Sequence, residues 1–376
     1  MSQRLFIGLM SGTSLDGVDG VLADFSGTPR VLAQSGRQMP ADLRQQFLLL
    51  NSSGNDELHR AALAANALTQ LYSETVHDLL AQARELGIDA RAISAIGAHG
   101  QTVRHQPQFG GTSGYTWQLH NPALLAELTG LDVIADFRNA DLAAGGQGAP
   151  LVPGFHAALW ADGQAVRAVL NIGGISNLTL LWPNRPVVGF DCGPGNALMD
   201  HWCERHTGRA FDANGQWAAS GRVRPDILER LLDEPFFAQA PPKSTGRDLF
   251  HPQWLATRLG PAAQDVPPQD VQATLTALTA RVCADDLKRY LPSAQELLVC
   301  GGGALNCELM RQLRDQLPGV LVHASDARGL PAMQVEACAF AWLAWCWFER
   351  RPASRPEVTG ARGARVLGAL YRASSR

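Results

Sequence analysis

Lysine is almost absent from this chain of 376 residues: Lys243 and Lys288 are the only lysines among 32 basic side chains. The formal net charge is −3 and the isoelectric point is about 6.4, and basic residues form no block. Proteins that grip nucleic acid by its phosphates usually carry a basic face. The composition therefore argues against a nucleic-acid partner, and a lysine that is retained becomes a candidate for a specific role.

Long apolar runs are also missing. The longest, from Ala337 to Phe348, falls short of the roughly 18 residues that a membrane span needs, and the apolar run at residues 5–10 is too short for a signal peptide. The seven cysteines are scattered, odd in number and never spaced as C-x-x-C, which argues against a disulfide framework or a zinc site. We expect a soluble cytoplasmic protein with no membrane partner.

The familiar nucleotide fingerprints do not occur. The chain has neither G-x-x-x-x-G-K-[ST] nor G-x-G-x-x-G, so it carries no Walker loop and no dinucleotide motif. Hydrophobic residues make up 46% of the chain and charged residues 18%, which is typical of a globular protein. Its length suits two domains of ordinary size. Any bound phosphates must therefore be held by another kind of loop.

Residues 5–25 offer such a loop. Two apolar, strand-forming runs flank SGTSLDG, in which Gly12 and Gly17 permit positive φ and close backbone approach. Amide and hydroxyl groups that converge on one hollow suit an anion with several oxygens. Asp16 would repel that anion unless a cation, most plausibly Mg²⁺, lies between them, and Asp19 is an alternative metal support. An ordinary hairpin turn remains the alternative for this stretch alone.

One later stretch has the same plan, and two others add further glycine turns. Residues 168–181 read as strand, small-residue turn and strand, and residues 187–202 run from a strand through DCGPGN into a helix. Residues 297–313 are a buried strand, a triple glycine and a helix, so that backbone can approach a flat ring or a ribose closely. Two phosphate-binding hairpins and a nucleoside element are therefore predicted, one hairpin in each half of the chain.

The first half contains further candidates. Residues 41–87 have helical spacing, and a buried strand ends at Gly97–Thr102, where α/β sheets usually meet ligands. Residues 106–118, rich in Gly, Pro and Gln, are predicted to be a surface loop. Asn121 and Pro122 predict a helix start. The segment from Arg138 to Pro150 is too glycine-rich for a helix and predicts a ligand-orienting loop, a hinge, or both.

Six motifs in the same order resemble one family. MSGTSLDGVDG, AHGQTVRH, LNIGGISNL, DCGPGNALMD, PPKSTGRD and CGGGALN together resemble the anhydro-N-acetylmuramic acid kinases, within the superfamily of actin, sugar kinases and Hsp70. Two positions depart from the family pattern: Cys192 stands where Thr is more usual, and Asp248 stands where Glu is. We expect the first to be a packing change.

The resemblance implies a fold and an activity. The fold is α/β, with two actin-like (ribonuclease H-like) domains and an ATP cleft between them, at residues 1–139 plus about 360–376, and 140–359. The activity uses ATP and water to open the 1,6-anhydro bridge of 1,6-anhydro-N-acetylmuramic acid and to phosphorylate O6, in peptidoglycan recycling. ATP and Mg²⁺ are the implied cofactors, the sugar is the implied partner, and a homodimer is a family expectation.

Site residues follow from the motifs and the resemblance together. Asp191, after a buried strand, is predicted to be the base that activates water, with a helix N-cap as the alternative. The metal is assigned to Asp16, directly or through water. The predicted nucleotide-binding residues are Gly12, Thr13, Ser14, Asp16, Gly17, Asp19, Asn171, Gly173, Gly174, Gly301, Gly302, Gly303 and Asn306. The predicted substrate-binding residues are Ser11, His99, Gln101, Arg138, Gly195, Asn196 and Glu336.

Two of the remaining assignments stay open. Glu336 begins an apolar helix, where it either holds a sugar hydroxyl or complements the helix dipole. Lys243, in PPKSTGRD, belongs either to a loop that closes over the ligand or to an exposed turn. Two rival functions also remain: an ordinary amino-sugar or hexose kinase, and a nucleotide-driven chaperone or filament subunit of the same superfamily. The absence of a peptide-binding module after the nucleotide core counts against the chaperone.

Overall fold

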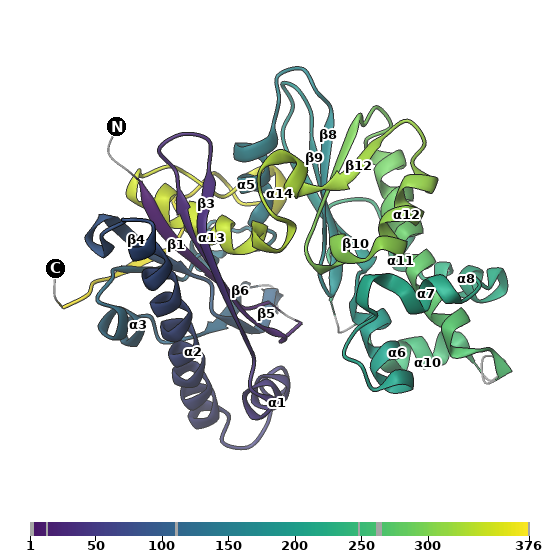
Figure 1. Cartoon of the computed structure of the whole chain (residues 1–376), viewed down its shortest axis with the longest axis horizontal. Helices are drawn as coiled ribbons and strands as arrows, with labels where there is room; N and C mark the ends of the chain where they lie inside the picture. Colours follow the sequence, from purple (N-terminus) through teal and green to yellow (C-terminus); the bar gives the residue numbers. More distant parts are fainter. Residues whose placement is uncertain (1–3, 13, 110–111, 247–248, 261–264, 375–376) are drawn as a thin grey trace. The chain divides into compact units, whose positions relative to one another are not determined.

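The structure, a computed structural model, describes residues 4–12, 14–109, 112–246, 249–260 and 265–374. The chain divides into two units (Figure 1). Unit 1 comprises Met1–Leu159 and Gln334–Arg376, and unit 2 comprises Trp160–Met333. The boundaries predicted from the sequence were at 139/140 and near 359/360 instead. The difference arises because the two helices next to the points where the chain passes between the units, α5 (Val152–Trp160) and α13 (Val335–Phe348), belong almost wholly to unit 1.

Unit 1 is built on a six-stranded sheet in the order β13-β7-β4-β1-β2-β3. The first three strands form an antiparallel meander, while β4 and β7 lie parallel to β1 and β13 closes the edge antiparallel to β7. The strands are β1 (Leu5–Met10), β2 (Gly17–Asp24), β3 (Arg30–Gln38), β4 (Ile93–Ala98), β7 (Val133–Ala135) and β13 (Ala369–Tyr371). The C-terminal segment thus returns to the first domain, as predicted.

Helices cover both faces of this sheet. Leu5, Ile7 and Leu9 pack into a core that includes α2, while Gly8, which points the other way along β1, faces α13. A Cβ on Gly8 would lie 1.9 Å from the carbonyl oxygen of Ala337, so only glycine admits α13 this close. The helices of unit 1 are α1 (Ala41–Leu50), α2 (Glu57–Glu85), α3 (Pro122–Thr129), α4 (Asn139–Ala143), α5, α13 and α14 (Pro356–Thr359).

Unit 2 has a five-stranded sheet in the order β10-β9-β8-β11-β12. Here too the first three strands are antiparallel, and β11 and β12 run parallel to β8. The strands are β8 (Arg167–Ile172), β9 (Ile175–Leu181), β10 (Val188–Pro194), β11 (Glu296–Cys300) and β12 (Leu321–Ala324), and the helices are α6 (Ala197–Thr207), α7 (Gln216–Ser220), α8 (Pro225–Leu232), α9 (Pro235–Ala238), α10 (Pro252–Leu259), α11 (Pro268–Tyr290) and α12 (Cys307–Gln316).

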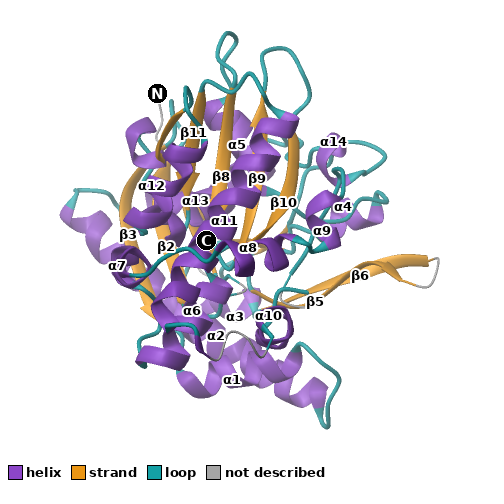
Figure 2. Cartoon of the chain, turned by 90° about the vertical axis from the view of Figure 1, so that its right-hand side faces the viewer, coloured by secondary structure: helices purple, strands orange, loops and turns teal. Residues whose placement is uncertain are grey.

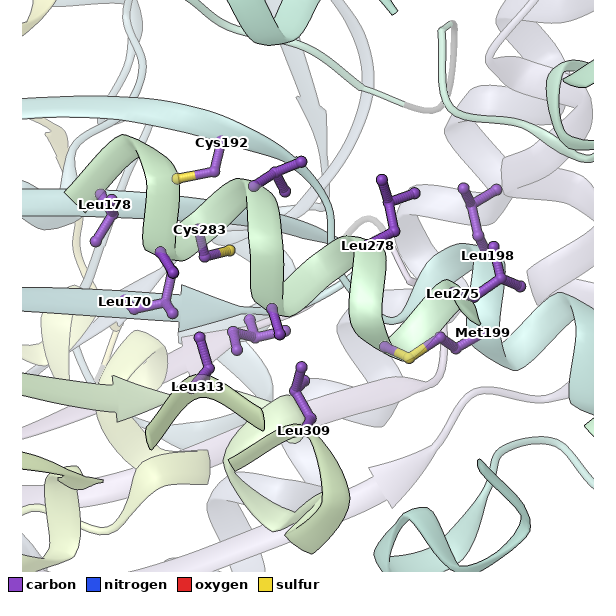
Figure 3. Close-up of a cluster of buried hydrophobic side chains, with 14 of the residues drawn as sticks. Leu170, Leu178, Cys192, Leu198, Met199, Leu275, Leu278, Cys283, Leu309 and Leu313 are labelled. Atoms are coloured by element: carbon purple, nitrogen blue, oxygen red, sulfur yellow. The ribbon is translucent and has the colours of Figure 1, made fainter. Parts of the chain in front are cut away.

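Helix α11 organises the core of unit 2. It is buried along most of its length, and its Leu275, Leu278 and Cys283 point toward apolar side chains from the sheet and from α6 and α12 (Figure 3). Cys192 lies in this core and is fully buried. Its thiol therefore serves packing, as expected for that departure from the family pattern.

The two units repeat one plan. In each unit, three antiparallel strands are followed by helices and then by two strands parallel to the first strand. When β13 and the β5–β6 hairpin are left out and the strands of each unit are numbered from one, both sheets have the order 3-2-1-4-5. This duplication confirms the predicted fold class of two actin-like α/β domains.

Two local predictions were wrong. The expected loop at 106–118 is instead a hairpin of β5 (Gln101–Phe109) and β6 (Thr112–Leu119), which forms its own two-stranded ribbon (Figure 2). The segment after Arg138, predicted to avoid helix, contains the short helix α4. Among the described strands, β5 and β6 pair with each other and with no larger sheet. The hairpin therefore does not have the buried face from which a strand is usually predicted. The residues of α4, Asn139–Ala143, come before the glycines of this segment, so those glycines do not weaken the helix.

Candidate functional site

The loop between β1 and β2 holds the first group of predicted residues. Ser11 is buried and donates to Gln101 Oε1 at 2.6 Å, so the loop is tied to the start of β5. Positive φ occurs at Leu15 (φ 60°), not at the glycines as expected. Gly17 is needed instead for close approach, since a Cβ there would lie 2.2 Å from Arg37 O. Thr13 lies outside the described residues.

Gly12 and the acidic residues of this loop face open space. A Cβ on Gly12 would meet only the hydroxyl of Ser14, at 3.7 Å, and Asp16 is exposed. Asp19 is also open to solvent on one side, yet the surrounding protein and, secondly, the carboxylate of Asp16 raise its pKa to about 6. A carboxylate whose pKa is raised by a second carboxylate beside it marks a place where a cation is favoured.

His99 is a buried hydrogen-bond acceptor. Its Nε2 lies 3.1 Å from Arg138 Nε and 2.9 Å from Arg138 Nη2, and Arg138 Nη1 donates to Gly148 O at 2.8 Å. Burial, the Arg138 guanidinium and His120 keep the pKa of His99 well below its usual value. The ring is therefore neutral at physiological pH, and it accepts from Arg138 through Nε2 and fixes the guanidinium.

Glu336 joins this group at the start of α13. Burial raises its pKa, and Asp19 adds to that effect while Arg138 opposes it. In turn, burial lowers the pKa of Arg138 to about 10, with Glu336 and Asp141 opposing the change. Since a pKa of about 10 still leaves Arg138 charged at pH 7, unit 1 presents a cation between carboxylates, next to a neutral histidine.

Unit 1 therefore brings together five of the seven predicted substrate residues, namely Ser11, His99, Gln101, Arg138 and Glu336. Asp141, in the segment predicted to orient a ligand, is fully buried and accepts from Gly148 N and Thr359 Oγ1, each at 2.8 Å. These bonds fasten the 139–148 segment to α14 within unit 1. That segment is therefore not the linker between the two units.

In unit 2, the glycine turns interlock through their backbones. Gly195 N and Asn196 N donate to Gly174 O and Gly173 O, at 2.9 and 2.8 Å. A Cβ on Gly195 would lie 2.3 Å from Gly173 O. The amides of Gly195 and Asn196 thus hold the β8–β9 turn and are not free for a ligand. The Asn196 side chain donates to Ile172 O at 3.1 Å, which leaves its Oδ1 as the group available to an incoming ligand.

The triple glycine packs on the end of β8. Gly301 has φ +76°, and a Cβ there would lie 2.6 Å from Asn171 Oδ1, while one on Gly303 would meet Ile172. Asn171 Oδ1 also accepts from Cys300 Sγ at 3.6 Å. The predicted residues 171, 173–174, 195–196 and 301–303 therefore form one surface. Asn306 is different: it caps α12 by accepting from Leu309 N at 3.0 Å, which gives it a structural role.

Asp191 lies beside this surface, on β10. The pairing of β10 with β9 shifts between Asp191 and Gly193, so a bulge at Cys192 lets both neighbours of Asp191 point into the core. Burial raises the pKa of Asp191 to about 6, while a hydrogen bond from Thr245 N, at 2.9 Å, and the charge of Lys243 oppose the rise. The N-cap of α6 is Asn196, so the N-cap alternative for Asp191 is wrong.

Lys243 is neither in an exposed turn nor free to close over a ligand. It is 6% exposed, and its Nζ lies 2.9 Å from Asp286 Oδ2 on α11. Asp286 and Thr245 were not predicted from the sequence as site residues. Only the scarcity of lysine hinted at this pair, because residues 243 and 286 are far apart in the chain. Asp248, the second departure from the family pattern, lies outside the described residues.

Comparison with known proteins decides the family. A family model described as anhydro-N-acetylmuramic acid kinase matches residues 4–373. A protein of that name from Variovorax paradoxus (strain S110) is 60% identical, over 99% of this chain and 100% of its own length. Another, from Bordetella petrii, is 59% identical over 98% and 96%. The chain belongs to the anhydro-N-acetylmuramic acid kinase family.

An anhydro-N-acetylmuramic acid kinase is a phosphotransferase, so the enzyme class predicted from the six motifs is confirmed. Among solved structures, a Clostridium difficile activator of 2-hydroxyisocaproyl-CoA dehydratase with bound ADPNP is 12% identical, with a TM-score of 0.48, over 92% of this chain and 96% of its own. Within the part of the chain that the structure describes, no helix combines the length and apolar character needed to cross a membrane.

Proposed function

We propose that this kinase uses ATP and water to convert 1,6-anhydro-N-acetylmuramic acid into N-acetylmuramic acid 6-phosphate and ADP, in cytoplasmic recycling of peptidoglycan. Family membership over residues 4–373 supports the substrate. The observation that carries the mechanism is Asp191: a half-buried carboxylate with a pKa of about 6, held by Thr245 N, beside a surface of glycine turns.

Asp191 is the general base. As water attacks the anomeric carbon, the carboxylate accepts the water proton, and the bond between that carbon and the bridging oxygen breaks. The bridging oxygen becomes O6 and takes the γ-phosphoryl group, and ADP leaves. A pKa of about 6 suits this step, because the group is mostly ionised at pH 7 yet remains basic enough to take a proton.

The residues of unit 1 bind the sugar. A muramic acid carries a carboxylate, and Arg138 offers a charged guanidinium whose plane is fixed by His99 and Gly148 O. Glu336 is suited to accept from a sugar hydroxyl, and the hydrogen-bonded pair of Ser11 and Gln101 offers polar atoms beside them. In unit 2, the side chain of Asn196 is the residue suited to add a polar contact.

Each unit has glycine-lined backbone that suits a nucleotide. Gly12 and Ser14 of unit 1, and residues 171, 173–174 and 301–303 of unit 2, let backbone approach the nucleotide without side chains in the way. Asp16 and Asp19 fit Mg²⁺, because this ion commonly takes one or two carboxylates together with water and phosphate oxygens. Among the described residues, no group of three metal-ligating side chains occurs. Bound there, Mg²⁺ would neutralise phosphate charge.

Two assays test the proposal. ADP release is measured with 1,6-anhydro-N-acetylmuramic acid and with a panel of free amino sugars and hexoses, and the anhydro sugar is expected to be by far the better substrate. In ¹⁸O-labelled water the label should enter at the anomeric carbon. Preference for a free sugar, or no label, would identify an ordinary sugar kinase. ATP hydrolysis without any sugar acceptor, coupled to polymerisation, would instead identify a filament subunit. The expected homodimer is tested by sedimentation velocity.

A further inference from the structure

Lys243 has an unusual setting for a surface-loop lysine. Its ammonium group lies 2.9 and 3.2 Å from the two carboxylate oxygens of Asp286, which is itself buried on α11. The rings of Phe236 and Phe190 lie 5.1 and 5.7 Å from the same nitrogen, within the range of cation–π attraction. The lysine thus ties the loop after α9 to the central helix of unit 2.

The residues that follow reach Asp191 through their backbone. Asp191 N donates to Lys243 O at 3.1 Å, and Thr245 N donates to Asp191 Oδ2 at 2.9 Å. Residues 243–245 therefore make two hydrogen bonds with Asp191, one with its backbone amide and one with its carboxylate. These bonds lie on the side of β10 that does not pair with β9, and among the described residues β10 is an edge strand, so no strand supports Asp191 on that side.

We propose that Lys243 is a positioning residue for Asp191: its buried pair with Asp286 anchors residues 243–245 to α11, and this segment aims the Asp191 carboxylate and keeps it ionised. The inference rests on the proposed role of Asp191 as the base. Lys243 itself touches no substrate in this account, and it acts through Thr245 N and through its charge.

The charges near Asp191 favour its ionised form. The ammonium of Lys243 lowers the pKa of Asp191, whereas burial raises it. Burial raises the pKa of Asp286, and Lys243 opposes that rise, so Lys243 favours the ionised form of Asp286. The neighbouring Cys192 has a pKa well above its usual value because it is buried, so its thiol is neutral. Removal of the Lys243 charge should therefore raise the pKa of Asp191.

A purely structural pair would act differently. Removing Lys243 alone would leave a buried carboxylate without a partner, which is strongly destabilising. The informative variant is the double change Lys243→Met/Asp286→Asn, which removes both charges and keeps similar volumes. If the pair only stabilised the fold, this variant would change the melting temperature and leave the pH profile of the folded enzyme unchanged.

The experiment compares four enzymes: wild type, Lys243→Met/Asp286→Asn, Lys288→Met and Asp191→Asn. Lys288 is the other lysine, exposed on α11, so its variant loses the same charge without contact to the loop. We expect the double variant to lose about 10²-fold in kcat, in line with a misplaced catalytic group, with KM for ATP unchanged. The acidic limb of its pH profile should move to higher pH, and Lys288→Met should match wild type.

Two results would overturn the inference and remain distinct. A folded double variant with wild-type kcat and an unmoved acidic limb would refute the positioning role, provided that Asp191→Asn loses turnover. If Asp191→Asn itself keeps wild-type turnover, the proposed base is wrong and the inference falls with it. Circular dichroism and the melting temperature of each variant establish that the protein is folded. Should the double variant not fold, Asp286→Asn with Lys243 retained is measured by the same profile, where a weakened anchor must still lower kcat.

Discussion

At the scale of single residues, Asp191 shows how the pKa of a carboxyl group can be raised while the group stays mostly ionised at pH 7. Burial raises its pKa to about 6, and one backbone amide with one nearby ammonium stops the rise there. A carboxylate in water would have a pKa near 3.9 and would be a weaker base. The protein therefore shifts the pKa of Asp191 toward the working pH by excluding water, and it limits the shift with specific partners.

Asp191→Asn should reduce turnover by about 10²–10⁴-fold, the usual cost of losing a general base. The amide keeps the shape of the carboxylate but cannot accept the proton, so ATP binding should be unchanged. Single-turnover kinetics and isothermal titration with a non-hydrolysable ATP analogue check the two parts. Turnover close to wild type would rule out the assigned base.

The pH dependence follows from the same pKa. The base must be deprotonated, so kcat/KM should be constant above about pH 6 and should fall about tenfold per unit below it. His99 should not contribute to this limb, because its pKa lies well below the usual value. A pH–rate profile in Asp191→Glu offers a control, since a longer carboxylate in the same place should move the limb without abolishing it. A limb that stays in place would point to another group.

Arg138 and Glu336 should govern the affinity for the sugar. Arg138→Gln removes a charged donor and should raise the KM for the anhydro sugar by about 10- to 100-fold, since a hydrogen bond to a charged group contributes about 1.5–3 kcal/mol. Glu336→Gln should have a smaller effect in the same direction. KM for ATP should not change. Arg44→Gln, on the exposed side of α1, is the matched control for loss of an arginine. An unchanged sugar KM in Arg138→Gln would contradict the assignment.

At the scale of elements, two glycines let α13 lie directly on the sheet of unit 1. A Cβ on Gly97 of β4 would lie 2.1 Å from Phe340 O, and one on Gly8 of β1 would lie even closer to Ala337 O. Both obstacles are backbone atoms of α13, so no side-chain rotation can relieve them. Because Glu336 begins this helix, the close packing also decides where the carboxylate of Glu336 lies.

Gly97→Ala should therefore lower the free energy of unfolding by about 3 kcal/mol, at the upper end of what overpacking usually costs. It should also raise the sugar KM through Glu336. Gly27→Ala is the control, because a Cβ there would have nothing within 4 Å. Urea unfolding of both variants gives the comparison. A loss below 1 kcal/mol for Gly97→Ala would show that α13 can shift away from the sheet.

Several elements were predictable because their signals are local. Asn121 does cap α3, accepting from Leu124 N at 3.1 Å, and Pro122 is its first residue. The two strand–turn–strand units, at 5–24 and 167–181, are likewise read from neighbouring residues. The β5–β6 hairpin was missed because polarity does not follow burial there: the aromatic Trp117 and Tyr115 are 51% and 39% exposed, while the polar Thr116 between them is buried.

At the scale of the whole molecule, the two units differ in chain connectivity. Unit 2 is one continuous stretch with its own apolar core, whereas unit 1 needs α13 and the C-terminal segment to complete its sheet and cover one face. A fragment folds alone only when its core is complete. The two units should therefore behave differently when they are separated.

The fragment 160–333 should unfold in one cooperative transition, and the fragment 1–159 should not fold. The first keeps the whole core around α11, and the second lacks the helix that covers β1 and β4. Thermal unfolding followed by near-ultraviolet circular dichroism checks both. A fragment 1–159 to which residues 334–376 are joined by a flexible linker is the control, and it should regain a transition. A folded fragment 1–159 would show that α13 is dispensable.

The sequence by itself determined the family and the duplicated α/β plan, and it predicted the candidate site residues. These signals are local: a strand, a small-residue turn and a strand are neighbours in the chain, and each motif lies within a dozen residues. Tertiary structure decided how those residues are held. Gly195 packs against the β8–β9 turn, Asn306 caps α12, Lys243 is buried against Asp286, and the units divide at 159/160 and 333/334, because hydrogen bonds and close packing between distant segments set these outcomes.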